Sequence, residues 1–179
     1  MKLLGLSGSL RADSHNTQLL RLAAEELLEG FELEIYDGLA EVPPYDNDLE
    51  DLTPEAVERL KAALADADGI LVATPEYNGS IPGQLKNVLD WVSRPINENP
   101  VRGKPVAVIG ASTGSFGAIW AQRELKKVLA IMGARVLEGE LGVAKAHERL
   151  AGSDDELRGL IAESVAELVN AVREDCVTA

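Results

Sequence analysis

Residues 69–74 read Gly-Ile-Leu-Val-Ala-Thr, a continuous apolar run of strand length. A strand with one face in water alternates apolar and polar side chains, so this run indicates a strand covered on both faces, at the centre of a parallel sheet. Residues 105–111 (Pro-Val-Ala-Val-Ile-Gly-Ala) repeat the pattern, and residues 2–6 open the chain with a shorter run. Together these runs predict a parallel sheet with buried central strands.

Segments of helical period separate the predicted strands. Leu19, Leu20, Ala23 and Leu27 fall on one helical face, and comparable stripes follow each later strand. Residues 153–156 have the spacing of a capping box and are expected to open the last helix. The predicted strands are residues 2–6, 31–35, 69–74, 105–111 and 135–138. This β-α alternation predicts an α/β fold, with residues 1–179 forming a single domain around a doubly wound, five-stranded parallel sheet.

The charge balance excludes several classes of partner. The chain of 179 residues carries a net charge of −13, which disfavours nucleic acid and anionic membranes because both would be repelled. The N-terminal apolar run is too short for a signal peptide or a membrane span, so we expect a cytoplasmic protein. One cysteine and two histidines predict neither an internal disulfide nor a metal centre.

Ligands of open parallel sheets bind beyond the carboxyl ends of the strands, where three loops of this chain have unusual chemistry. The first loop, residues 7–16, combines hydroxyls, an arginine and the start of a helix. These features predict a phosphate site formed by Ser9, Arg11, Ser14 and Asn16. The loop lacks both the P-loop and the dinucleotide fingerprints, which points to a mononucleotide such as FMN. The alternative is a plain loop capped by Ser14 or Asn16.

The second and third loops are expected to contact the same ligand. In residues 75–83, two prolines stiffen the backbone and Asn-Gly accepts positive φ, which would hold N–H groups along a flat ring. The candidate residues there are Pro75, Glu76, Tyr77, Asn78 and Gly79. Glu76 could act as a general base or only through its backbone. In residues 112–117, the glycines predict close backbone approach to the same ligand, with a flexible strand-to-helix turn as the alternative.

These motifs together resemble those of the NAD(P)H-dependent FMN reductase family. The resemblance rests on Gly-Ser-Leu-Arg-x-x-Ser-x-Asn at residues 8–16, Thr-Pro-Glu-Tyr-Asn-Gly-Ser-Ile-Pro-Gly at residues 74–83, Leu-Lys-Asn at residues 85–87 and Asp-Trp at residues 90–91. The family, which includes bacterial chromate, quinone and azo reductases, implies a flavodoxin-like fold with strand order 2-1-3-4-5. It further implies that the first loop holds the FMN phosphate and that the second loop lines the flavin. The third loop would contact the flavin through Ser112, Thr113 and Gly114, and the protein would be a homodimer or homotetramer.

The resemblance implies an enzyme that passes hydride from NADPH or NADH through FMN to a small-molecule electron acceptor. Quinones, azo compounds, chromate and free flavin are the expected acceptors, with ping-pong kinetics and no catalytic side chain, because the cofactor carries the chemistry. The main alternative is a flavodoxin-like electron carrier that does not oxidise NAD(P)H. A short-chain dehydrogenase is disfavoured, because no tyrosine is followed by lysine four residues later.

The charges are unevenly distributed along the chain. Residues 32–58 contain ten acidic residues and no lysine or arginine, whereas residues 76–135 contain eight basic and four acidic residues. Because the second segment carries two of the three loops, we expect its basic side chains to attract anionic FMN and NAD(P)H to the site.

Overall fold

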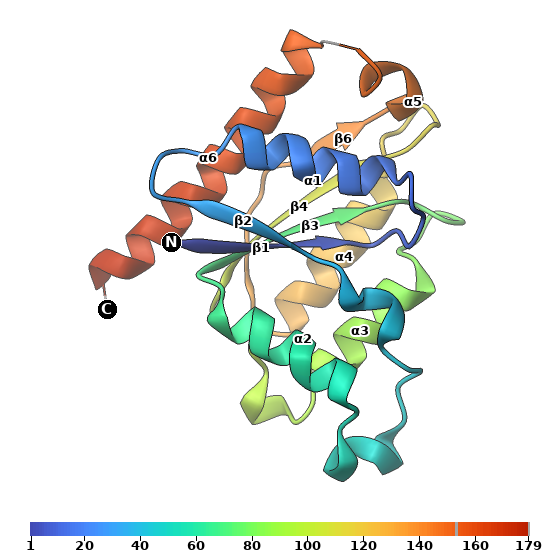
Figure 1. Ribbon diagram of the computed structural model, residues 1–179, viewed down its shortest axis with the longest axis vertical. Helices are drawn as coiled ribbons and strands as arrows, with labels where there is room; N and C mark the ends of the chain where they lie inside the picture. The colour runs from blue at the N-terminus through green and yellow to red at the C-terminus, as the bar shows by residue number, and fades with distance from the viewer. Residues whose placement is uncertain (153, 179) are drawn as a thin grey trace.

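The computed structural model describes residues 1–152 and 154–178 and confirms the predicted α/β sheet (Figure 1). Its strands are β1 (Lys2–Ser7), β2 (Glu32–Tyr36), β3 (Gly69–Thr74), β4 (Pro105–Ala111), β5 (Arg135–Val136) and β6 (Leu141–Val143). All strand pairs are parallel, and the order β2-β1-β3-β4-β5 is the flavodoxin-like order that the resemblance implies.

The fifth strand position differs from the prediction. We expected one strand at residues 135–138, but β5 ends at Val136, and β6 pairs separately with the end of β4. Between them, the carbonyl groups of Glu138 and Gly139 accept hydrogen bonds from Lys126 Nζ at 2.8 and 2.7 Å. Because a lysine side chain takes these carbonyls, the chain leaves the ladder there and rejoins it at Leu141.

Helices cover both faces of the sheet. They are α1 (His15–Glu25), α2 (Glu55–Asp66), α3 (Gly83–Val92), α4 (Ile119–Ile131), α5 (Ala146–Arg149) and α6 (Asp155–Thr178), with short 3-10 helices η1 (Gly38–Glu41), η2 (Asn47–Leu52) and η3 (Ile96–Glu98). Helices α1 and α6 pack on one face, and α2, α3 and α4 pack on the other. Within the described residues, none of these helices combines the length and apolar character needed to cross a membrane.

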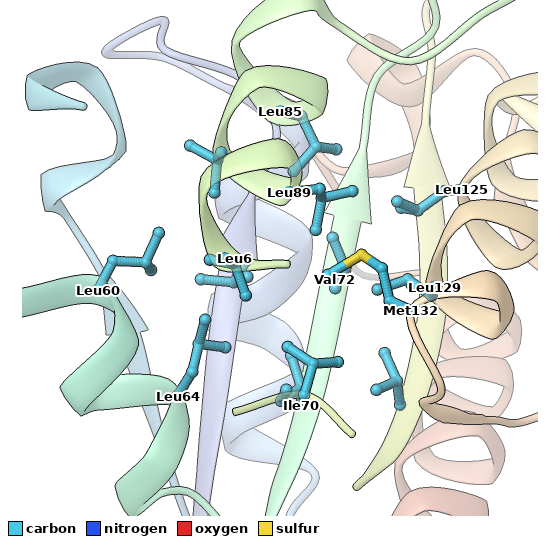
Figure 2. Packing of buried hydrophobic residues seen from close by; sticks show 14 of the residues in the cluster. Leu6, Leu60, Leu64, Ile70, Val72, Leu85, Leu89, Leu125, Leu129 and Met132 are labelled. Atoms are coloured by element: carbon cyan, nitrogen blue, oxygen red, sulfur yellow. The ribbon is translucent and has the colours of Figure 1, made fainter. Parts of the chain in front are cut away.

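The core follows from the strand register. Leu6 lies beside Val72, which in turn lies beside Val108, so that one row of apolar side chains crosses three strands toward α3 and α4. Figure 2 shows this row's Leu6 and Val72 beneath Leu85 and Leu89 of α3. Burial on both faces explains why the central strands lack polar alternation.

The last helix begins one residue later than the capping-box spacing suggests. Ser153, the first residue of that motif, lies outside the described residues. Asp154 caps the helix, because its Oδ1 accepts the Leu157 N–H at 2.8 Å, and its carboxylate also pairs with Arg149. The pairing with Arg149 lowers the pKa of Asp154, so the cap stays charged to a lower pH than an unpaired aspartate would.

Candidate functional site

The three predicted loops meet at the carboxyl edge of the sheet, because β1, β3 and β4 are parallel neighbours. They enclose a cavity of about 120 Å³, here called the three-loop cavity. Its lining is Ser9, Arg11, Ser14, His15, Asn16, Pro75, Glu76, Tyr77, Ala111, Ser112 and Thr113. Of the predicted site residues, Asn78, Gly79 and Gly114 lie in the same loops but do not line this cavity. Segments about a hundred residues apart in sequence therefore build one site.

The first loop presents hydroxyl groups and helix N–H groups to the cavity. Ser14 is the N-cap of α1, and its Oγ accepts the Thr17 N–H at 3.2 Å, which leaves the hydroxyl hydrogen available to a ligand. The N–H groups of His15 and Asn16, in the first turn, have no carbonyl partner within the helix. With the exposed Arg11 guanidinium nearby, this end of the cavity suits an anion.

His15 is a site residue that the sequence motifs did not single out. His15 lines the cavity, and its Nδ1 is buried and has no hydrogen-bond partner among the described residues. Leaving a buried polar atom unpaired costs free energy, and a ligand oxygen in the cavity would supply the missing partner. His15 directly follows the capping serine, so its position could have been inferred from sequence, but the burial of its Nδ1 could not.

Asn16 anchors the first loop to β4. Its Nδ2 donates to the Ala111 carbonyl at 3.0 Å, and its Oδ1 accepts the Ala111 N–H at 2.9 Å. The side chain is 3% exposed, so it completes the hydrogen bonding of a backbone unit that would otherwise be left unpaired in the interior. Asn16 therefore offers a ligand chiefly its backbone N–H group.

The second loop ends in a two-residue hairpin. Tyr77 and Ser80 exchange two backbone hydrogen bonds of 3.0 and 3.1 Å. Asn78 and Gly79, between them, have φ values of 55° and 73°, as the Asn-Gly pair predicts for a tight turn. The hairpin leaves the Tyr77 side chain 52% exposed, so it offers an aromatic face at the mouth of the cavity.

Glu76 connects the second loop to helix α4. Its Oε2 accepts the N–H groups of Trp120 and Ala121 at 3.0 and 3.1 Å. The N-cap of α4 is Ala118, which has no side-chain oxygen, so Glu76 supplies the cap from 44 residues away along the chain. A carboxylate engaged in this way is a structural clamp between the second and third loops and is poorly placed to act as a general base.

Gly8 allows the first and second loops to pack together. A Cβ atom at this position would lie 3.0 Å from Leu85 Cδ2 and 3.2 Å from Pro75 Cδ. Its N–H donates to the Ala73 carbonyl at 2.8 Å, at the end of β3. The glycine is thus required by close approach of the two loops.

The third loop is supported by a segment in which the sequence shows no motif. The Ser112 N–H donates to the Val143 carbonyl, and the Ser112 carbonyl accepts the Ala146 N–H. The Lys145 N–H donates to the Gly114 carbonyl at 2.9 Å. Residues 143–146, between β6 and α5, therefore hold the third loop in place.

The remaining motif residues have structural roles. Asn87 accepts the Tyr45 N–H and donates to the Pro43 carbonyl, and Trp91 Nε1 donates to the same carbonyl at 2.9 Å. These bonds hold the segment after η1 against α3.

The prediction that the basic side chains of residues 76–135 attract the ligand at the site is wrong, because the basic side chain there comes from another segment. None of the eight lysines and arginines of residues 76–135, all within the described part of the chain, lines the three-loop cavity. Several are paired instead, as in Lys86–Asp90 and Arg123–Glu140. The guanidinium at the cavity belongs to Arg11, from the first loop.

Comparisons with known proteins find relatives that cover most of this chain. Residues 1–148 match the family described as NADPH-dependent FMN reductase. An NAD(P)H-dependent FMN reductase from Pseudomonas aeruginosa is 39% identical over 174 residues, which cover 94% of this chain and 93% of the relative. A 2-hydroxy-1,4-benzoquinone reductase from a Burkholderia species is 42% identical over 132 residues, covering 74% of this chain and 72% of that protein.

A solved structure shows the same fold. The flavoenzyme NAD(P)H:acceptor oxidoreductase from Paracoccus denitrificans superposes with a TM-score of 0.86 at 32% identity, covering 97% of both chains.

Proposed function

The chain belongs to the NADPH-dependent FMN reductase family, and we propose that it uses FMN, with the phosphate held in the three-loop cavity, to reduce a quinone at the expense of NAD(P)H. The observation that carries this proposal is the meeting of hydroxyls, helix N–H groups, Arg11 and the unpaired His15 Nδ1 at one small cavity. These groups fit a phosphate, which offers several acceptor oxygens and negative charge.

Each loop then has a distinct role in binding the cofactor. Ser9, Arg11, Ser14 and the N–H of Asn16 hold the phosphate, with His15 Nδ1 as an added donor. The second loop, through Pro75, Glu76, Tyr77, Asn78 and Gly79, lines the ring and the ribityl chain. The third loop, through Ser112, Thr113 and Gly114, would also contact the flavin. The clamp from Glu76 to α4 fixes the distance between these two loops.

When bound, FMN supplies two-electron chemistry that the side chains cannot supply. In the net reaction NAD(P)H gives up a hydride and becomes NAD(P)⁺, and the quinone takes up that hydride and one proton to become a hydroquinone. The chain's contribution is to bind and orient the reactants and to direct backbone N–H groups at the ring. No side-chain base is required, which agrees with the engagement of Glu76 as a helix cap.

Several finer features belong to the same proposal. Quinones are the favoured acceptor, since the relatives include a benzoquinone reductase and Tyr77 offers an exposed aromatic face. Chromate, azo compounds and free flavin are further acceptors. We further propose that the two substrates use the same place in turn, in ping-pong order, with NAD(P)⁺ leaving before the acceptor enters. We also propose that residues 1–179 form one domain of a cytoplasmic homodimer or homotetramer. The exposed Ile96, in η3, and Ile131, at the end of α4, offer apolar surface for a contact between subunits.

The test is quinone-dependent oxidation of NADPH and NADH by the FMN-loaded protein, followed by the loss of reduced-nicotinamide absorbance. Oxidation that requires FMN and is stimulated by quinone is expected. A loaded protein that oxidises neither nucleotide would instead be an electron carrier of the flavodoxin type.

A further inference from the structure

The aromatic side chains that reach solvent are gathered around the candidate site. Of the seven aromatic residues, all within the described part of the chain, three are exposed: Tyr77, Phe116 and Trp120. Tyr77 belongs to the second loop and lines the three-loop cavity. Phe116 belongs to the third loop, and Trp120 lies in the first turn of α4, shortly after it. Neither Phe116 nor Trp120 was a predicted site residue.

Phe116 and Trp120 pack against each other and leave much of their surface in solvent. Their ring centroids are 4.8 Å apart, and their planes are inclined at 59°. Phe116 is nevertheless 65% exposed, and Trp120 is 46% exposed. The other tryptophan, Trp91, is buried and packs edge-on against Tyr45. Two large rings side by side in water forgo the free energy that burial would provide, so the pair indicates a surface that a ligand covers.

The pair is fixed beside the cofactor site through Glu76. The carboxylate of Glu76, which lines the three-loop cavity, accepts the Trp120 N–H at 3.0 Å. The Phe116 carbonyl accepts the Ile119 N–H at 3.2 Å, which joins the third loop to the same helical turn. Neither ring lines the three-loop cavity itself, where we place the FMN phosphate. The two rings therefore border the cofactor site from outside the cavity.

The segments that carry the exposed rings are free of charged residues. Residues 112–122 contain no Asp, Glu, Lys or Arg, and neither do residues 77–85, although 26% of the chain is charged. A neutral planar ring can stack on one face of such a pair and meet the edge of the other ring. To an inorganic anion the same segments offer no positive charge. The surface therefore suits a neutral aromatic ligand.

We propose that Phe116 and Trp120 bind the electron acceptor and select neutral, fused-ring aromatic acceptors, the naphthoquinone class, over inorganic anions. This inference rests on the proposed function. Electron transfer needs contact between acceptor and flavin, so an acceptor placed on the flavin comes within reach of the residues that flank the third loop. A fused bicyclic ring has the area to contact both the flavin and the pair. A single-ring benzoquinone covers less of either.

The test uses Trp120→Ala and Phe116→Ala, with Leu52→Ala as the matched control. Leu52 is an exposed apolar residue of η2 that does not line the three-loop cavity. The hydrogen bonds of Trp120 and Phe116 come from backbone atoms, so both variants keep the clamp from Glu76. Calorimetry without NAD(P)H, so that no turnover occurs, measures the Kd of 2-methyl-1,4-naphthoquinone for the FMN-loaded protein. Loss of either ring should weaken binding about tenfold, and Leu52→Ala should leave it unchanged.

Kinetics at saturating NADPH give the second readout. With the naphthoquinone, both variants should raise KM about tenfold and keep kcat within about twofold, and Trp120→Phe should recover most of the loss. With benzoquinone the loss should be smaller. With ferricyanide, of which two ions each take one electron from every NADPH oxidised, the rates should equal those of the wild type.

An unchanged naphthoquinone Kd in both variants, or equal losses with naphthoquinone and ferricyanide, would overturn the inference. A raised Kd for FMN would assign the rings to the cofactor, and a changed subunit number in light scattering would assign them to a second copy of the chain; either result would also overturn it. All these results leave wild-type NAD(P)H oxidation intact. Absence of that oxidation with every acceptor would refute the proposed function itself.

Discussion

Replacing Glu76 separates its role as a clamp from a role in proton transfer. In Glu76→Ala, helix α4 loses the carboxylate that accepts from Trp120 and Ala121, and Ala118 cannot replace it. Loss of a helix cap together with its favourable charge costs about 2 kcal/mol of unfolding free energy. For a domain of this size that corresponds to a fall in Tm of about 4–8 °C. Glu76→Gln keeps one acceptor oxygen and loses only the charge, so its cost is about 0.5–1 kcal/mol.

The assay measures Tm by circular dichroism of the FMN-free protein, the Kd for FMN, and kcat at saturating FMN. Glu163→Gln, an exposed acid in the middle of α6, is the matched control and should not change Tm. We expect Glu76→Gln to lower Tm slightly and Glu76→Ala to lower it more, and FMN binding to weaken in the same order. The kcat of both variants should stay within about fivefold of the wild-type value, because the clamp positions the loops without transferring a proton. A Glu76→Gln variant with unchanged Tm and FMN affinity but a kcat reduced by about a hundredfold or more would refute the clamp and indicate a general base.

Three further predictions concern the site and the last helix. His15→Ala should weaken FMN binding by about tenfold in a fluorescence titration while riboflavin binding is unchanged, because the lost donor faces the phosphate; equal losses for both ligands would contradict the assignment. Asn16→Ala should cost about 2–3 kcal/mol in urea unfolding, because it leaves the buried Ala111 peptide unpaired, and a cost below about 0.5 kcal/mol would show that water replaces the carboxamide. Because Arg149 lowers the pKa of Asp154 in the folded protein, the pair stabilises α6 above the ordinary carboxyl pKa and loses this effect as pH falls through the lowered value. Unfolding of Asp154→Asn should therefore vary less with pH in the acid range than that of the wild type, and identical profiles would count against the ion pair.

The central strands were predictable because burial on both faces removes polar residues from them. β3 begins and ends where the apolar run does, at Gly69 and Thr74. The fifth strand was less predictable, because its interruption depends on the Lys126 side chain, which reaches residues 138 and 139 from a different element. Local pattern can identify strands, but it cannot identify side chains that compete for their carbonyls.

The candidate site shows the same limit. The tight turn at Asn78 and Gly79 could be predicted from the sequence, because their positive φ values follow from their own residue types. The sequence did not predict that Glu76 clamps the second loop to α4. Its hydrogen-bond partners lie on α4, and a capping residue can be recognised in a sequence only when it directly precedes its helix. The prediction that the basic side chains of residues 76–135 face the ligand failed for a related reason. Counting charges along the sequence does not show which lysines and arginines already form ion pairs.

The most direct test of the central claim is a titration of the FMN-free protein with FMN and with riboflavin, which lacks only the phosphate. If the three-loop cavity holds that phosphate through Arg11, Ser14 and the start of α1, FMN should bind at least about a hundredfold more tightly than riboflavin, and Arg11→Ala should remove most of this difference. Equal affinities for the two ligands in the wild-type protein would contradict it.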